Sequence, residues 1–290
     1  MTGYPVVLAN VTMCYGATVA VDDVGLNLEP NRIHGLLGRN GAGKSTLLSG
    51  LAALRPVTGG SIQIDGVDPF ENQALTSRIC LIRESGDLID FEKARVAIQF
   101  VASIRPTFDL ELAKELADRF EVDLNRKVRA LSRGKASALG ALLGIASRAP
   151  LTMFDEVHLG MDAPTRQLFY DALIADFAEH PRTVILSSHL ISEVESLLET
   201  VTILHHGKVL LSGEADDLRS QGMTLTGPAD VVDRISAGHQ IVGQRDLGRT
   251  RQVTLFGADD DVANAARRAG LDLGGVPLQD MFIHLTEGQK

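Results

Sequence analysis

The stretch that most constrains the fold is a glycine-rich segment, Gly38-Arg39-Asn40-Gly41-Ala42-Gly43-Lys44-Ser45-Thr46. It follows an apolar run, Ile33 to Leu37, and precedes a leucine-rich segment, residues 47–54, so the pattern predicts a strand, a loop and a helix. The glycines let backbone N–H groups turn inward, and the helix N-terminus adds partial positive charge, so a polyphosphate is the expected ligand. In such a loop Lys44 reaches the β- and γ-phosphates, and the Ser45 hydroxyl binds Mg²⁺. The alternative is a flexible loop that contains Lys-Ser by chance.

Length and charge narrow the class of protein. With 290 residues and 44% hydrophobic content, the chain can bury one large core and a smaller second one. A net charge of -9 and the lack of a long basic run argue against a nucleic-acid partner. Cys14 and Cys80 fall in predicted strands and are interpreted as buried hydrophobes in a reducing cytosol. The longest uncharged apolar run, residues 136–147, is too short to span a membrane, so any membrane role is expected to need a partner.

The first half is predicted to be rich in strands. Val6 to Met13 and Val19 to Leu28 flank the turn at Tyr15-Gly16 and predict a hairpin at a sheet edge. Further strands are expected at 61–65 and 78–82. An aromatic ring at this turn could stack on a nucleotide base, whereas the alternative is that Tyr15 covers the strand core.

The character of the chain changes to helical between Glu92 and Arg148, with an interruption at Pro106. The last helix of this insertion opens at Leu131-Ser132-Arg133-Gly134-Lys135. Ser132 is a good N-cap, and Gly134 leaves free N–H groups at the positive helix end, so this is a second candidate anion site. An ordinary capped helix explains the same residues equally well.

Acidic and histidine side chains follow two apolar strands. Residues 151–154 lead into Asp155 and Glu156, and residues 183–186 lead to His189. Ligands bind at the carboxyl edge of parallel strands, so we expect Asp155 to hold Mg²⁺, Glu156 to deprotonate the attacking water and His189 to contact a γ-phosphate. A solvated strand end and an ordinary histidine are the alternatives. His205 and His206 are interpreted as turn residues rather than metal ligands.

Five of these segments, over about residues 4–218, resemble the ATP-binding subunits of ABC transporters. The chain has GRNGAGKST as the phosphate loop, LSRGK in place of the signature LSGGQ, LTMFDE as the Walker B strand, GMD ending at Asp162 as the D-loop, and SSH as the switch histidine. Tyr15 matches the aromatic residue that stacks on adenine. The resemblance implies ATP and Mg²⁺ as cofactors and a head-to-tail homodimer or heterodimer. In that dimer Ser132, Gly134 and Lys135 of one subunit face the nucleotide of the other.

Three departures from the family pattern stand out. Glu84 occupies the place of the usual glutamine after residues 78–82, and we hypothesise that it helps to hold Mg²⁺ and couples it to the membrane partner. A merely tolerated change is the alternative. Arg133 replaces glycine and Lys135 replaces glutamine in the signature, which should favour closure on a triphosphate. Val157 stands where proline is frequent and is interpreted as neutral.

The expected fold is an α/β P-loop NTPase core of ABC type with an antiparallel β edge. It occupies residues 1–218, with a helical subdomain at about 86–148. Residues 222–290 predict a small α+β domain of β-α-β-β-α-β, ferredoxin-like pattern. This domain is interpreted as a packing or dimer-stabilising appendage, with a regulatory or partner-sensing module as the alternative.

The leading functional hypothesis is an ATPase subunit that drives export through a separate integral membrane transporter subunit. The chain would then be cytoplasmic and peripheral on the inner face of the cell membrane. The ending LQDMFIHLTEG resembles that of bacterial exporter ATPases for drugs, peptides and lipids, which favours export. The alternatives are a cytosolic ABC-type switch acting on the ribosome or DNA, and a weakly hydrolysing regulatory subunit.

Overall fold

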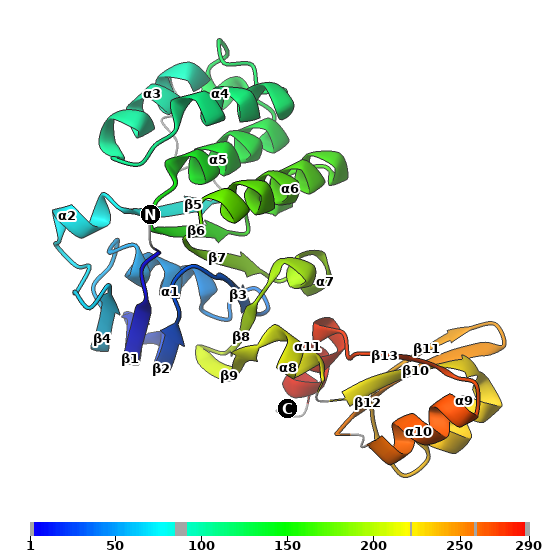
Figure 1. Cartoon of the computed structure of the whole chain (residues 1–290). Helices are drawn as coiled ribbons and strands as arrows, with labels where there is room; N and C mark the ends of the chain where they lie inside the picture. The colour runs from blue at the N-terminus through cyan, green and yellow to red at the C-terminus, as the bar shows by residue number, and fades with distance from the viewer. Residues whose placement is uncertain (1–2, 85–91, 221, 258–259, 288–290) are drawn as a thin grey trace. The chain divides into compact units, whose positions relative to one another are not determined.

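The computed structural model describes residues 3–84, 92–220, 222–257 and 260–287 (Figure 1). Contacts within the chain divide it into two compact units. The first comprises the chain up to His189 together with 204–209, and the second comprises 190–203 and the chain from Leu210 onward. The sequence analysis predicts a domain boundary near residue 220 and so assigns segments 190–203 and 210–220 to the first domain. In the structure these two segments belong to the second unit.

The first unit begins with an antiparallel sheet. Strands β1 (Val6–Tyr15), β2 (Thr18–Leu28) and β4 (Gly59–Ile64) lie in the order β2-β1-β4. Val6 pairs with both Leu28 and Ile64, and all three side chains are buried. The hairpin predicted around Tyr15-Gly16 is therefore present and forms the antiparallel edge of the core.

A parallel sheet positions the site. Strands β5 (Ile79–Arg83), β6 (Leu151–Asp155), β7 (Thr183–Ser188) and β3 (Ile33–Leu37) are neighbours in that order. Every residue of β3, β6 and β7 is buried, as expected for strands covered on both faces. Their carboxyl ends meet, because Leu37 lies beside Ser188, Asp155 beside Ser187 and Arg83 beside Asp155. The loops after these strands therefore share one edge.

Helices surround this sheet. The phosphate loop leads into α1 (Lys44–Leu51), and the Walker B strand is followed by a 3₁₀ turn, Val157–Gly160, and α6 (Ala163–Glu179). The short α2 (Gln73–Thr76) precedes β5. The helical insertion consists of α3 (Ala94–Ile104), α4 (Leu110–Arg119), a 3₁₀ turn, Val128–Ala130, and α5 (Arg133–Ser147) (Figure 1). Asp109 caps α4 and Ser132 caps α5 through side-chain bonds to Leu112 N–H and Lys135 N–H.

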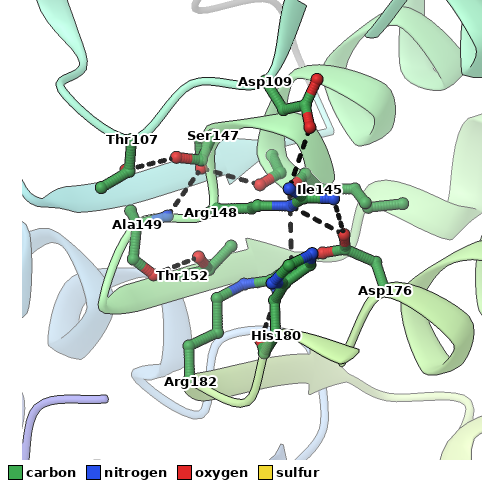
Figure 2. A network of polar contacts seen from close by, with 11 residues as sticks. Thr107, Asp109, Ile145, Ser147, Arg148, Ala149, Thr152, Asp176, His180 and Arg182 are labelled. Atoms are coloured by element: carbon green, nitrogen blue, oxygen red, sulfur yellow. Dashed lines mark hydrogen bonds and ion pairs between the residues drawn. The ribbon is translucent and has the colours of Figure 1, made fainter. Parts of the chain in front are cut away.

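A partly buried charge network joins α4, α5 and α6 (Figure 2). Asp176 of α6 accepts from Arg182 Nη1 at 2.7 Å and from Arg148 Nε at 2.9 Å. Arg148, the C-cap of α5, also lies 2.9 Å from the carboxylate of Asp109, the N-cap of α4. Arg182 is only 2% exposed, and burial lowers its pKa while Asp176 opposes that change. One carboxylate thus compensates two guanidinium groups between the helical insertion and the sheet.

The second unit contains α7 (Ile191–Val194), a 3₁₀ turn, Glu195–Leu197, and α8 (Ala215–Arg219). The elements that follow are β10 (Gly222–Pro228), α9 (Ala229–Ser236), β11 (Gln240–Leu247), β12 (Thr250–Phe256), α10 (Asp260–Arg268), β13 (Asp272–Gly274) and α11 (Leu278–Glu287). The strands are antiparallel in the order β11-β12-β10-β13. Leu225, Val232, Val253 and Leu255 form part of its core.

The tail explains why segments 190–203 and 210–220 belong to this unit. The Leu278 N–H donates to Glu195 Oε2 at 3.1 Å, and the Val276 N–H donates to the Arg219 carbonyl at 3.2 Å. The β8–β9 hairpin (Thr200–His205 and Lys208–Glu214) is divided, since its tip at 204–209 belongs to the first unit. Among the described helices, none is both long and apolar enough to cross a membrane.

Candidate functional site

The phosphate loop is held in the backbone conformation that its glycines permit. Gly43 has a φ of 105°, and a Cβ atom there would lie 2.4 Å from the Ala20 carbonyl oxygen. A larger residue would therefore be excluded both by strain and by the neighbouring strand. The Gly207 N–H donates to the Ala42 carbonyl at 3.0 Å, so the tip of the β8–β9 hairpin supports the loop from outside.

Lys44 lies inside this loop and is 5% exposed. Its Nζ donates to the carbonyls of Gly38 at 2.6 Å and Arg39 at 3.2 Å, and lies 3.1 Å from Glu156 Oε1. The ammonium group is therefore placed among the loop carbonyls and the predicted general base. A triphosphate that enters the loop would compete with Glu156 for this charge.

Glu156 directly follows β6 in a left-handed conformation, with a φ of 55°. Its N–H donates to the Ser187 carbonyl at 3.2 Å, which fixes the backbone against β7. Its Oε2 lies 2.9 Å from Nδ1 of His189, while Oε1 faces Lys44. The structure thus brings the three predicted catalytic residues, Lys44, Glu156 and His189, into one cluster.

Asp155 is the last residue of β6 and is 5% exposed. Its Oδ1 accepts a hydrogen bond from Ser187 Oγ at 2.7 Å, which orients the carboxylate. Ser45 lies in the first turn of α1 beside Lys44. A hydroxyl and a carboxylate are hard oxygen donors of the kind that Mg²⁺ accepts together with phosphate oxygens and water, so this donor set fits that metal. Within the described residues there is no group of three or more His, Cys, Asp and Glu side chains that would hold a metal alone.

His158 is a residue of this cluster that the sequence analysis did not single out. It is 3% exposed, and its Nε2 lies 3.1 Å from Ser188 Oγ and 3.9 Å from Glu156 Oε2. Burial, with contributions from Arg166 and His189, lowers its pKa from 6.5 to about 4, so the ring is neutral near pH 7. Only its position two residues after Glu156 could have drawn attention to it.

Tyr15 ends β1 and is 45% exposed. The guanidinium carbon of Arg55 lies 3.9 Å from the centre of its ring, a cation–π contact. Arg55, which follows α1 in sequence, was not identified from the sequence. The contact places the Tyr15 ring beside the segment that follows α1.

The signature residues lie at the start of α5 and contact a different set of groups. A Cβ on Gly134 would lie 3.0 Å from the Gly160 carbonyl oxygen, so the two backbones are in close approach. Arg133 forms an ion pair with Glu84, and Lys135 donates to the Phe120 carbonyl at 2.7 Å and lies 3.1 Å from Glu121. Both cations predicted to face a triphosphate therefore have partners within their own chain.

The remaining predicted residues occupy element ends. Asp162 is the N-cap of α6, and the hydrogen bonds from Thr165 lower its pKa. His205 and His206 form the predicted turn before Gly207, with ring centres 4.1 Å apart. A cavity of about 220 Å³ lies between them and residues 39–42 of the phosphate loop. Desolvation, His206 and Arg39 lower the pKa of His205.

Comparison with known proteins agrees with this geometry. Residues 21–158 match the family model described as ABC transporter. The chain is 27% identical over 239 residues to the ABC transporter ATP-binding protein YtrB of Bacillus subtilis, covering 82% of each chain. It is 26% identical over 295 residues to the daunorubicin resistance ATP-binding protein DrrA3 of Streptomyces coeruleorubidus, covering 94% of this chain and 92% of that one.

Among solved structures, a dimeric ATP-binding cassette in a post-hydrolysis state bound to ADP and Pi is similar in fold. The TM-score is 0.65 at 23% identity, over 72% of this chain and 98% of that one. At this identity the likeness concerns the fold alone.

Proposed function

We propose that this chain, whose residues 21–158 match the ABC transporter family model, is an ATP-binding subunit that hydrolyses ATP in a head-to-tail dimer to drive export through a separate membrane subunit. The observation that carries the proposal is the cluster of Lys44, Asp155, Glu156 and His189 at one edge of the parallel sheet. Each side chain is held by a named neighbour at the place where ligands of such sheets bind.

In the proposed reaction, the loop N–H groups and Lys44 bind the β- and γ-phosphates, which releases Lys44 from its ion pair with Glu156. The freed carboxylate orients and deprotonates the attacking water, and His189 holds that carboxylate through its 2.9 Å contact. Ser45 and Asp155 would hold Mg²⁺, which supplies charge neutralisation on the phosphates. The hydrogen bond from Ser187 keeps the Asp155 carboxylate in place for this task.

A second copy completes the site in this proposal. The N-terminus of α5 carries Ser132 as its N-cap, which accepts from the Lys135 N–H at 3.3 Å, and the backbone of Gly134 lies close to the Gly160 carbonyl. A helix start of this kind favours an anion, and the triphosphate bound by the other subunit is the anion that the family arrangement supplies. The similar cassette solved as a dimer supports this arrangement.

The direction of transport rests on the relatives. The alignment with the daunorubicin resistance protein covers 94% of this chain and so extends into residues 222–290, which lie beyond the end of the family model at residue 158. A drug-resistance subunit is expected to serve an exporter. The proposed location follows: the inner face of the cell membrane, reached through the membrane subunit.

The test is ATP hydrolysis by the purified full chain. We expect Lys44→Ala to lower kcat/KM at least about a hundredfold, because it removes a charge aimed at the transferred phosphoryl group. Lys114→Ala is the matched control, since Lys114 is 52% exposed and pairs only with its neighbour Glu111 at 2.7 Å among the interactions described. Equal turnover by Lys44→Ala and the unaltered chain would refute the assignment. Co-purification of an integral membrane protein tests the transport partner separately.

A further inference from the structure

Two departures from the family pattern contact each other. Glu84 stands where a glutamine is usual and Arg133 where a glycine is usual, and the Arg133 Nη2 donates to the Glu84 Oε1 in an ion pair. The residues are 49 positions apart in sequence. We propose that they form a matched pair that positions the start of α5 and, through it, the turn that carries Glu156. This inference rests on the proposed function and deepens it.

The electrostatics of α5 explain why the two residues need each other. Arg133 is the first residue of the helix, where the macrodipole favours a negative charge. The first turn of α5, all of which the structure describes, contains no acidic residue. Glu84 supplies the missing carboxylate from the end of β5. In return, Arg133 compensates a carboxylate that would otherwise face the phosphates bound beside Asp155.

The backbone of Glu84 is hydrogen-bonded to the Walker B strand. Its N–H donates to the Asp155 carbonyl at 3.0 Å, so its backbone continues the pairing of β5 with β6. Its side chain is 25% exposed, whereas that of Arg133 is 74% exposed. The carboxylate therefore holds an exposed cation at the start of the helix to a backbone position that is paired with the Walker B strand.

The start of α5 in turn contacts the segment after the general base. Glu156 precedes the 3₁₀ turn Val157–Gly160, and the Gly160 carbonyl lies against Gly134. A Cβ on Gly160 would lie 2.1 Å from Ser137 Oγ of α5, so the packing leaves no room for either backbone to shift alone. A displacement of the helix start is thereby transmitted to the turn that begins at Glu156.

A double-mutant cycle on the full chain tests the pair. Glu84→Gln removes a charge at nearly constant side-chain size, and Arg133→Gln removes the opposite charge with a shorter polar side chain; we expect each to lower kcat about threefold with little change in KM. The double variant should lose no more than the worse single variant, because neither charge is then left alone. The coupling should decline at about 0.5 M salt, since the pair is exposed enough to be screened.

The controls separate this inference from the proposed function. The Glu111→Gln, Lys114→Gln cycle probes an exposed pair on α4 and should leave kcat unchanged. If the unaltered chain shows no Lys44-dependent hydrolysis, the proposed function fails, and the same cycle is then evaluated on nucleotide-free thermal unfolding. In this unfolding experiment, a Tm shift of the double variant that is smaller than the sum of the two single-variant shifts supports the matched pair. If the enzyme is active and the losses in kcat of the two single variants multiply in the double variant, the matched pair is refuted. Tm shifts of the single variants that add in the double variant also refute it.

Discussion

The residue that most needs a physical account is His158, because it places an ionisable ring in the interior beside the carboxylate of Glu156, the proposed general base. It is 3% exposed, and its Nε2 contacts Ser188 Oγ at 3.1 Å. A charged imidazolium there would face Arg166 and His189 in addition to losing its hydration. The neutral ring therefore packs at low cost and leaves Glu156 to interact with Lys44 and His189.

The lowered pKa of His158 predicts how stability depends on pH. The unfolded chain binds a proton near pH 6.5, whereas the folded chain binds it only near pH 4. Between these values the unfolded state binds more protons, so the free energy of unfolding falls as the pH is lowered from 6.5 to 4. His158 alone should contribute a loss of roughly 3 kcal/mol over this window. Urea unfolding at a series of pH values measures it.

His158→Gln serves as the comparison, because glutamine keeps an amide group near Ser188 but does not titrate. We expect this variant to be less stable than the unaltered chain at pH 7 and to lose that difference progressively toward pH 4. Parallel stability curves for the two proteins would contradict a buried neutral histidine.

At the same scale, the sequence predicts residues that belong to a motif and misses those that meet only in three dimensions. Lys44, Glu156 and His189 were predicted because each follows a buried strand or a glycine-rich loop. Arg55 and the Glu84–Arg133 contact depend on the folding of the helical insertion and of α1 against neighbouring strands. The sequence indicated that Arg133 is unusual, but no local pattern indicates its partner.

At the scale of elements, the network around Asp176 joins α4, α5 and α6 (Figure 2). We expect Asp176→Asn to destabilise the chain by about 3–5 kcal/mol, because it leaves two guanidinium groups without their shared carboxylate, and Arg182 is 2% exposed. Thermal and urea unfolding measure the change. Glu115→Gln breaks the exposed ion pair with Arg119 at 3.6 Å and should change stability by less than about 0.5 kcal/mol. Similar effects of the two variants would contradict the role assigned to burial.

Element type was easier to predict than element boundaries. The sequence places an interruption at Pro106 but does not say where the next helix begins; it begins at Leu110, because Asp109 accepts from the Leu112 N–H and so acts as its N-cap. The β-α-β-β-α-β order of residues 222–276 follows its alternating and helical patterns. The assignment of 190–203 to the same compact unit depends on long-range bonds such as that between Leu278 and Glu195, which no local pattern encodes.

At the scale of the whole molecule, the proposed head-to-tail dimer predicts that assembly depends on the state of the nucleotide. The start of α5 is a helix N-terminus, whose partial positive charge favours an anion, while the phosphate loop has the lysine and the hydroxyl expected to bind a triphosphate. Binding of ATP supplies the charge that links the two surfaces, and hydrolysis removes it. Glu156→Gln retains the loop and Lys44 but lacks the general base, so the bound triphosphate should persist.

We therefore expect Glu156→Gln to elute as a dimer in size-exclusion chromatography with Mg-ATP and as a monomer with Mg-ADP. The variant should also bind ATP at least as tightly as the unaltered chain, because Lys44 no longer faces a charged carboxylate 3.1 Å away. Adding Lys44→Ala to Glu156→Gln should abolish the ATP-dependent dimer, which links assembly to the phosphate loop. Adding Lys114→Ala should not, since that lysine lies on the exposed face of α4. If Glu156→Gln hydrolyses ATP at the normal rate, Glu156 is not the general base. If Glu156→Gln binds ATP and remains monomeric, a second copy of this chain does not complete the nucleotide site.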